Sequence, residues 1–110
     1  MRVIPRLSEW LRRLFRRSWR TVVLEGEQLP GALPSKTLVV LMDDGEPWSA
    51  GMMCPCGCGR TLEVMLLPGV KPRWDVSIDA QLRPTLNPSV WVADGCRSHF
   101  WLTDGQVRWC

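Results

Sequence analysis

The feature that most constrains this chain is a pair of cysteine-containing clusters that stand far apart in the sequence. Residues 54–59 read CPCGCG, and residues 95–99 read GCRSH with the only histidine of the chain. Proline fixes one backbone torsion and glycine admits positive φ angles, so such turns can direct several thiols toward one point. Thiolate and imidazole are ligands of tetrahedral structural zinc sites. The sequence therefore predicts a Zn²⁺ site built from both clusters.

The two clusters offer more candidate ligands than the four positions of tetrahedral zinc can use. The candidates are Cys54, Cys56, Cys58, Cys96 and His99. Cys96 and His99 have a common ligand spacing, so we predict that they bind together and that the first cluster supplies the other two ligands. An iron–sulfur cluster of a Rieske-like kind, held by three cysteines and one histidine, is an alternative. Free thiols beside a core histidine are a further one.

The length and the cysteine usage suggest where such a chain would work. At 110 residues it is one small domain, a size that a metal often helps to stabilise. Its five cysteines cannot all pair with one another. The N-terminus lacks the apolar run of about 7–15 residues that a signal peptide needs, and residues 38–42 are too few to span a membrane. We expect a cytoplasmic protein with reduced thiols and no transmembrane segment.

Residues 1–20 are predicted to form a basic segment in front of a metal-stabilised β-rich domain at residues 21–110. This segment holds seven arginines and one acid, whereas the remainder holds seven basic and ten acidic residues. Apolar residues recur at helical spacing over residues 7–15, which predicts an amphipathic helix. Its polar side carries Arg12, Arg13, Arg16, Arg17 and Arg20. The helix could pack on the domain or a partner chain, bind nucleic acid or anionic lipid, or act as a targeting peptide.

Short β-branched and apolar runs between turns predict about eight strands in the rest of the chain. The expected strands cover residues 21–24, 36–42, 48–53, 61–67, 74–79, 90–92, 98–103 and 106–110, with an interruption at 87–89 and an Asp-Gly hairpin turn at 104–105. Two of these strands flank the first cysteine cluster and would present its thiols from a hairpin. The predicted fold class is mostly β (α+β), a small antiparallel β-domain with a zinc-ribbon-like metal site and an N-terminal amphipathic helix.

The first cluster with its following arginine (CPCGCGR, residues 54–60) resembles the opening of the SEC-C zinc motif. In that motif the first two cysteines bind zinc, and a serine stands where this chain has Cys58. The resemblance implies that Cys54 and Cys56 are ligands and that Cys58 is a spare fifth or substitute ligand. The second ligand pair of the motif follows closely, whereas Cys96 lies far downstream, so only the first half is similar.

A wider pattern covers roughly residues 35–110. The segments CPCGCGR, NPSVW and GCRSHFWLTDGQVRWC resemble a family of small bacterial zinc-binding-type proteins whose genes neighbour ubiquitin-like conjugation genes. The resemblance implies an accessory part in bacterial ubiquitin-like protein conjugation, with an antiphage role and protein partners from that system. The Arg-rich helix lies outside the matched region.

The predicted function is a structural-zinc interaction module rather than an enzyme, with an enzyme kept as an alternative. If His99 binds the metal, no Ser-His-Asp or Cys-His pair can form. Glu63 lies near the first cluster but is expected to be a solvated strand residue rather than a base for a zinc-bound water. Cys110 is expected to be a core residue or an exposed thiol. A nucleic-acid-binding protein using the Arg-rich helix and a Rieske-like redox protein are the alternatives.

Overall fold

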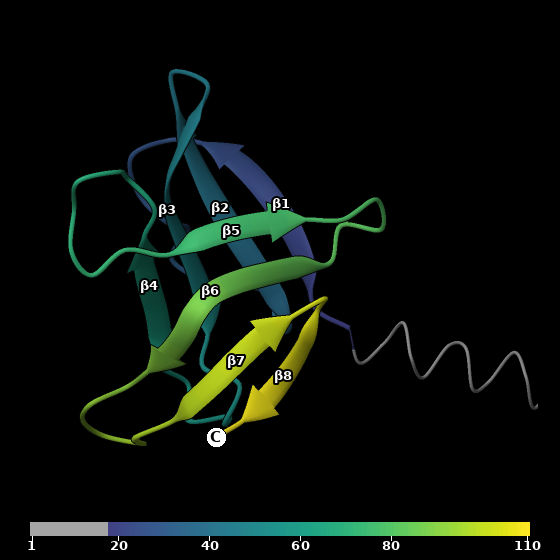
Figure 1. Ribbon diagram of the computed structural model, residues 1–110, viewed down its shortest axis with the longest axis vertical. Coiled ribbons are helices and arrows are strands. Elements are labelled where there is room, and N and C mark those ends of the chain that lie inside the picture. The colour runs from purple at the N-terminus through teal and green to yellow at the C-terminus, as the bar shows by residue number, and fades with distance from the viewer. Residues whose placement is uncertain (1–17) are drawn as a thin grey trace, which may run out of the picture.

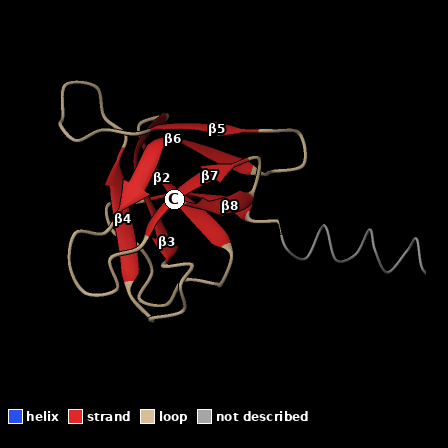
Figure 2. Ribbon diagram, turned by 60° about the horizontal axis from the view of Figure 1, so that its bottom comes forward, coloured by secondary structure: helices blue, strands red, loops and turns tan. Residues whose placement is uncertain are grey.

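The computed structural model describes residues 18–110, which form eight β-strands connected by loops (Figure 1). The strands are β1 (Arg20–Glu25), β2 (Thr37–Asp43), β3 (Glu46–Met53), β4 (Thr61–Met65), β5 (Asp75–Ile78), β6 (Pro84–Trp91), β7 (His99–Thr103) and β8 (Gln106–Trp109). This part of the chain contains no helix (Figure 2), and hence none that could span a membrane. The predicted amphipathic helix lies mostly outside the described residues, as do four of its five arginines. The fifth, Arg20, begins β1.

The first four strands form one sheet, in the order β1-β2-β3-β4. Strands β2, β3 and β4 pair antiparallel as predicted, whereas β1 runs parallel to β2 because residues 26–36 cross back to the start of β2. Strand β2 is buried on both faces, which explains its unbroken apolar run. On the outer face, Leu29 from the β1–β2 connection lies against Gly51, where any Cβ would collide with its side chain. A side chain at this position of β3 would therefore force Leu29 to shift.

The last four strands form a second sheet, in which all neighbours are antiparallel and follow chain order. The predicted Asp-Gly hairpin is confirmed, with φ angles of 50° at Asp104 and 74° at Gly105, both in the left-handed region that tight hairpin turns use. Strand β6 begins six residues earlier than residue 90, at Pro84. The predicted interruption at 87–89 appears instead as a register shift between Leu86 and Val90 within the strand.

The two sheets pack face to face, with the β5–β8 sheet in front of the β1–β4 sheet in Figure 1. Their inner faces share one apolar core, to which Leu38 and Ala50 contribute from one sheet and Leu86, Phe100 and Leu102 from the other, all fully buried. The strands therefore alternate between core-facing and outward-facing side chains. This alternation decides which residues of β6 and β7 reach the surface.

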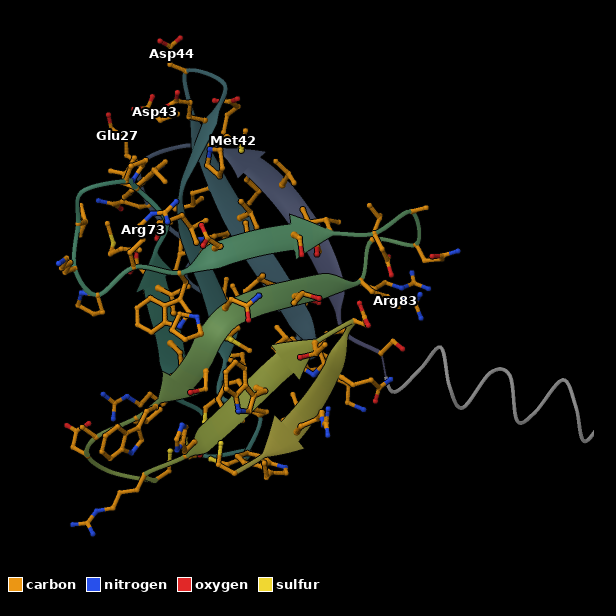
Figure 3. The ribbon with its side chains drawn as sticks, viewed as in Figure 1. Glu27, Met42, Asp43, Asp44, Arg73 and Arg83 are labelled. Atoms are coloured by element: carbon orange, nitrogen blue, oxygen red, sulfur yellow. The ribbon has the colours of Figure 1, made fainter. Side chains whose placement is uncertain are left out.

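The ends of the two-layer structure differ in chemistry. Figure 3 shows Asp43 and Asp44 at the tip of the β2–β3 hairpin, with Glu27 beside them. Arg83 is the last residue before β6, and its Nε lies 2.6 Å from Asp79 Oδ2 within the turn between β5 and β6 (Figure 3). The turn after β3 and the loop between β6 and β7 lie at the opposite end from the acidic hairpin (Figure 1). Those two loops carry four of the five cysteines.

Candidate functional site

Four thiols from the two loops converge on one point. Cys54, Cys56 and Cys58 come from the turn between β3 and β4, and Cys96 comes from the loop between β6 and β7, with all four Sγ atoms within 4.8 Å of one another. Cys54 Sγ lies 3.4 Å from Cys56 Sγ and 3.7 Å from Cys96 Sγ. A tetrahedron with Zn–S bonds of about 2.3 Å has edges of about 3.8 Å, so the spacing suits a four-thiolate metal site. The four cysteines could thus hold a metal ion.

Local backbone geometry explains how the first loop presents three thiols. The Cys54 N–H donates to the Arg60 carbonyl at 2.8 Å and closes the turn, while the Gly57 N–H donates to the Cys54 carbonyl at 3.2 Å. Gly57 and Gly59 have φ angles of 88° and 85°, which L-residues with side chains rarely adopt. The two glycines therefore let the chain fold back between successive cysteines.

The second loop is held by its own hydrogen bonds and by a link to the first loop. The Val92 N–H donates to the Ser98 carbonyl at 2.7 Å, which closes the loop below Cys96. Arg60 Nη1 lies 2.8 Å from Asp94 Oδ1 and joins the two loops across their exposed side. Backbone hydrogen bonds and this ion pair thus hold the two cysteine-containing loops next to each other.

The buried hydroxyl of Ser98 lies beneath the thiols. Its Oγ is 3.2 Å from Cys96 Sγ and 3.5 Å from Cys54 Sγ. Hydrogen bonds from the side chain and backbone of Ser98 lower the pKa of Cys96 to about 6, whereas burial raises the pKa of Cys54 to about 11. The lowered pKa favours the thiolate form of Cys96 at neutral pH, whereas a metal that binds Cys54 would have to displace its proton into the solvent.

The predicted metal ligands do not all lie together in the structure. Cys54, Cys56 and Cys96 lie together, and Cys58 joins them as the fourth thiol. His99 lies outside this group, because it begins β7 and its ring projects from the outer face of the second sheet. The four-thiol group therefore needs no histidine to complete a tetrahedron.

His99 instead forms a hydrogen bond with Ser89, which was not among the predicted site residues. Ser89 Oγ lies 2.9 Å from His99 Nε2, on the outer face of neighbouring strands β6 and β7. Both side chains are partly exposed, whereas Val90 between Ser89 and Trp91 points into the core. Ser89 lies within the register shift between Leu86 and Val90 of β6. Irregularities of this kind are common near active sites, where they change the direction of a side chain. A Ser–His pair at this distance can supply an activated nucleophile.

Two tryptophans fix the surroundings of the pair. Trp74 Nε1 donates to the Ser89 carbonyl at 3.2 Å and anchors the serine backbone. Trp91 stacks on the His99 ring, with ring centroids 5.6 Å apart and an interplanar angle of 26°. Both tryptophans also line a hollow of about 220 Å³ between β4 and β6. Trp74 and Trp91 therefore lie between the Ser–His pair and a small surface pocket that neither Ser89 nor His99 lines.

The remaining candidates do not join either group. Glu63 is exposed on β4 and accepts a hydrogen bond from Ser49 Oγ at 2.7 Å, in keeping with the expected solvated strand position. Cys110 is an exposed free thiol, and its N–H donates to the His99 carbonyl at 3.0 Å. Within residues 18–110, no carboxylate forms a hydrogen bond or ion pair with the His99 ring.

Ser89 could have been found in the sequence. It lies in the segment NPSVW (residues 87–91), which shares the wider family pattern with the segment GCRSHFW (residues 95–101). The prediction that no Ser-His-Asp or Cys-His arrangement could form assumed that His99 binds the metal, and for that reason no serine partner of His99 was considered. Once Cys58 is counted as the fourth thiol, His99 is available to the serine.

Comparisons with known proteins give one family. Neither the curated proteins nor the solved structures contain a match to this chain. A protein-family model described as "Bacterial ubiquitination-like system serine protease (BubE)" matches residues 25–110, which include all four grouped cysteines, Ser89 and His99. The predicted association with bacterial ubiquitin-like conjugation operons is confirmed. The chain belongs to the BubE family of bacterial ubiquitination-like system serine proteases.

Proposed function

We propose that this protein is a serine protease in which Ser89 is the nucleophile and His99 is the general base. The observation that carries the proposal is the 2.9 Å separation of Ser89 Oγ and His99 Nε2 on an accessible sheet face. This distance is within the reach that proton transfer from a serine to its base requires. The description of the family as serine proteases supports the same reaction class.

The reaction would use the pair in the usual order of acyl transfer. The Ser89 hydroxyl attacks the scissile carbonyl while Nε2 of His99 takes its proton, and the resulting imidazolium then protonates the leaving amine. Water then attacks the acyl carbon and gives a proton to the same nitrogen, and the imidazolium returns this proton to Ser89 Oγ as the acid product leaves. This sequence needs His99 with its proton on Nδ1 before attack, so that Nε2 can accept from the hydroxyl.

For substrates, we infer proteins of a bacterial ubiquitin-like conjugation system. The family description supports this system as the setting. The Ser–His pair lies on the open face of a sheet beside a hollow of about 220 Å³, which is smaller than the roughly 300–1,000 Å³ of drug-sized ligand pockets. Such a site suits an extended chain that places one side chain in the hollow. We propose that the cleaved bond joins a ubiquitin-like protein either to a terminal extension or to a modified target.

We also propose that the four grouped cysteines hold Zn²⁺ in a structural role. Four thiolates complete the tetrahedron and leave no open position for water or substrate, which is the pattern of structural rather than catalytic zinc. The ligand set that the distances favour is Cys54, Cys56, Cys58 and Cys96. A metal bound there would stabilise the loop that joins the two strands carrying Ser89 and His99.

A fluorophosphonate probe tests the proposed nucleophile without knowledge of the natural substrate. Ser89 Oγ would form a bond to phosphorus, the P–F bond would break, fluoride would leave, and the hydroxyl proton would pass to His99. We expect mass spectrometry to find the phosphonyl group on Ser89 of the zinc-loaded protein. Ser89→Ala should abolish labelling, and His99→Ala should slow it roughly 100-fold or more.

Ser77→Ala is the matched control, because Ser77 is an exposed serine on β5 of the same sheet without a histidine partner. It should label like the wild type. Labelling that survives in Ser89→Ala would overturn the proposed nucleophile. The substrate proposal is tested separately, by incubating the protein with a ubiquitin-like protein from the same operon carrying a C-terminal extension. Intact substrate after incubation with a protein that labels normally would contradict that part alone.

A further inference from the structure

Trp91 is highly exposed to solvent, although a large apolar side chain is more stable when it is buried. It is the most exposed large apolar side chain among the described residues, with 69% of its surface accessible. Its position follows from the strand pattern, because Val90 points into the core and turns both of its neighbours outward. An exposed tryptophan at a fixed position next to a candidate active site needs an account beyond core packing.

The exposed position of Trp91 is explained by its contact with the imidazole ring of His99. In the β6–β7 ladder, Trp91 is the register partner of His99, and its indole stacks on the imidazole at 5.6 Å. Ser89, two residues earlier on the same face of β6, holds Nε2 of the same ring. The imidazole is therefore held at one edge by the serine and across one face by the tryptophan.

In a Ser-His-Asp triad, a carboxylate on Nδ1 orients the histidine and stabilises the imidazolium that forms during the reaction. No carboxylate of residues 18–110 contacts the His99 ring. An aromatic face can serve both purposes, because it restricts ring rotation by contact and attracts a cation through its quadrupole. We propose that Trp91 is the positioning residue of this site, taking by stacking the place that a third, acidic residue has in a triad.

This inference rests on the proposed function, so its test must separate the two. The test uses the zinc-loaded full chain and the fluorophosphonate probe, with saturation kinetics that resolve the maximal labelling rate from probe binding. We expect Trp91→Ala and Trp91→Leu to lower the maximal rate roughly 10- to 100-fold, because a misplaced general base loses that much. Trp91→Phe retains an aromatic face and should stay within about 3-fold of the wild type.

Comparing Trp91→Leu with Trp91→Phe separates the effect of the aromatic face from that of apolar volume, because leucine is apolar but has no aromatic ring. Trp101→Ala is the matched control: Trp101 is another exposed tryptophan of the same sheet, two residues beyond His99 on β7, and should label at the wild-type rate. Equal rates for Trp91→Leu and Trp91→Phe would overturn the stacking role. Wild-type rates in Trp91→Ala would also overturn it.

The single histidine of the chain provides a second readout. In protein labelled with ¹⁵N-histidine and purified without a histidine tag, only His99 gives imidazole signals. We expect the wild type and Trp91→Phe to show one tautomer, and Trp91→Ala to show averaged ring nitrogens. If Ser89→Ala is unlabelled but Trp91→Ala behaves as wild type in both readouts, the inference fails and the proposed function stands. If Ser89→Ala still labels, the proposed function itself fails.

Discussion

Arg60 Nη1 lies 2.8 Å from Asp94 Oδ1, and this ion pair joins the turn after β3 to the loop between β6 and β7. Those loops belong to different sheets and supply all four grouped thiols. Both side chains are exposed, so water and salt screen the pair and its share of overall stability is small. We expect the pair to act instead on the relative position of the two cysteine-containing loops.

The first prediction concerns this pair. Arg60→Gln should leave the melting temperature almost unchanged, while zinc passes to a chromophoric chelator a few-fold faster because the two loops can separate more easily. Arg73→Gln is the control, since it breaks an ion pair of similar length with Asp75, outside the two metal loops. Equal release from all three proteins would show that the ion pair does not restrain the loops.

The second prediction separates the proposed metal site from the proposed catalytic pair. Cys58→Ser should lower bound zinc well below the wild-type content, because it removes one of four thiolates. His99→Ala should keep the zinc content of the wild type and lose probe labelling. Cys110→Ser is the thiol control and should change neither quantity. Elemental analysis that finds full zinc in Cys58→Ser and none in His99→Ala would restore the ligand set that includes the histidine.

The third prediction links metal removal to activity. The loop over residues 92–98 contains Cys96 and connects the strand of Ser89 to the strand of His99. Removing the metal should therefore loosen the pair and lower the labelling rate roughly 10-fold or more, with recovery after zinc is added back. The measurement is the labelling rate against chelator concentration. A rate that stays constant after complete zinc loss would show that the hairpin alone aligns the pair.

The fourth prediction is a dependence of stability on pH. The carboxylate of Asp79 accepts hydrogen bonds from the Arg83 N–H at 2.8 Å and the Gln81 N–H at 2.9 Å, and these bonds together with the Arg83 side chain lower its pKa from 3.8. A carboxyl group whose pKa is lower in the folded state stabilises the fold above its unfolded pKa, and that contribution is lost as the pH falls through the folded value.

Asp79→Asn should therefore melt below the wild type at pH 6, and the two melting temperatures should converge below about pH 4. Thermal unfolding at a series of pH values measures this difference, and acid loss of zinc cancels because both proteins share it. Asp75→Asn is a control carboxylate in the same sheet, with an exposed ion pair. A difference that persists unchanged down to pH 3 would mean that the carboxylate charge at Asp79 is not what stabilises the turn.

Local patterns in the sequence predict most of the fold. Strands β2, β3, β7 and β8 match the expected ranges closely, because each contains apolar residues and has a turn with glycine on at least one side. The parallel pairing of β1 could not be predicted, since it depends on how residues 26–36 cross the sheet and on Leu29 filling the space over Gly51. Such contacts join distant segments and leave no local period in the sequence.

The site was predicted in part for a related reason. Composition and spacing identify the thiols, because metal ligands cluster in turns with glycine and proline. Spacing alone cannot decide whether Cys58 or His99 completes the set, since this depends on which face of β7 the histidine occupies. The family pattern contains Ser89, but its contact with His99, with 2.9 Å between Oγ and Nε2, depends on how β6 and β7 pair in the fold.

A metal held by Cys54 and Cys96 would also act as a cross-link between the two sheets. The residues are 42 positions apart, and closing a loop of that length removes unfolded-chain entropy worth about 4 kcal/mol when a disulfide does it. Coordination would give a comparable constraint with thiols that stay reduced. The domain would then gain the kind of staple that secreted proteins obtain by oxidation, but one that opens when zinc becomes scarce.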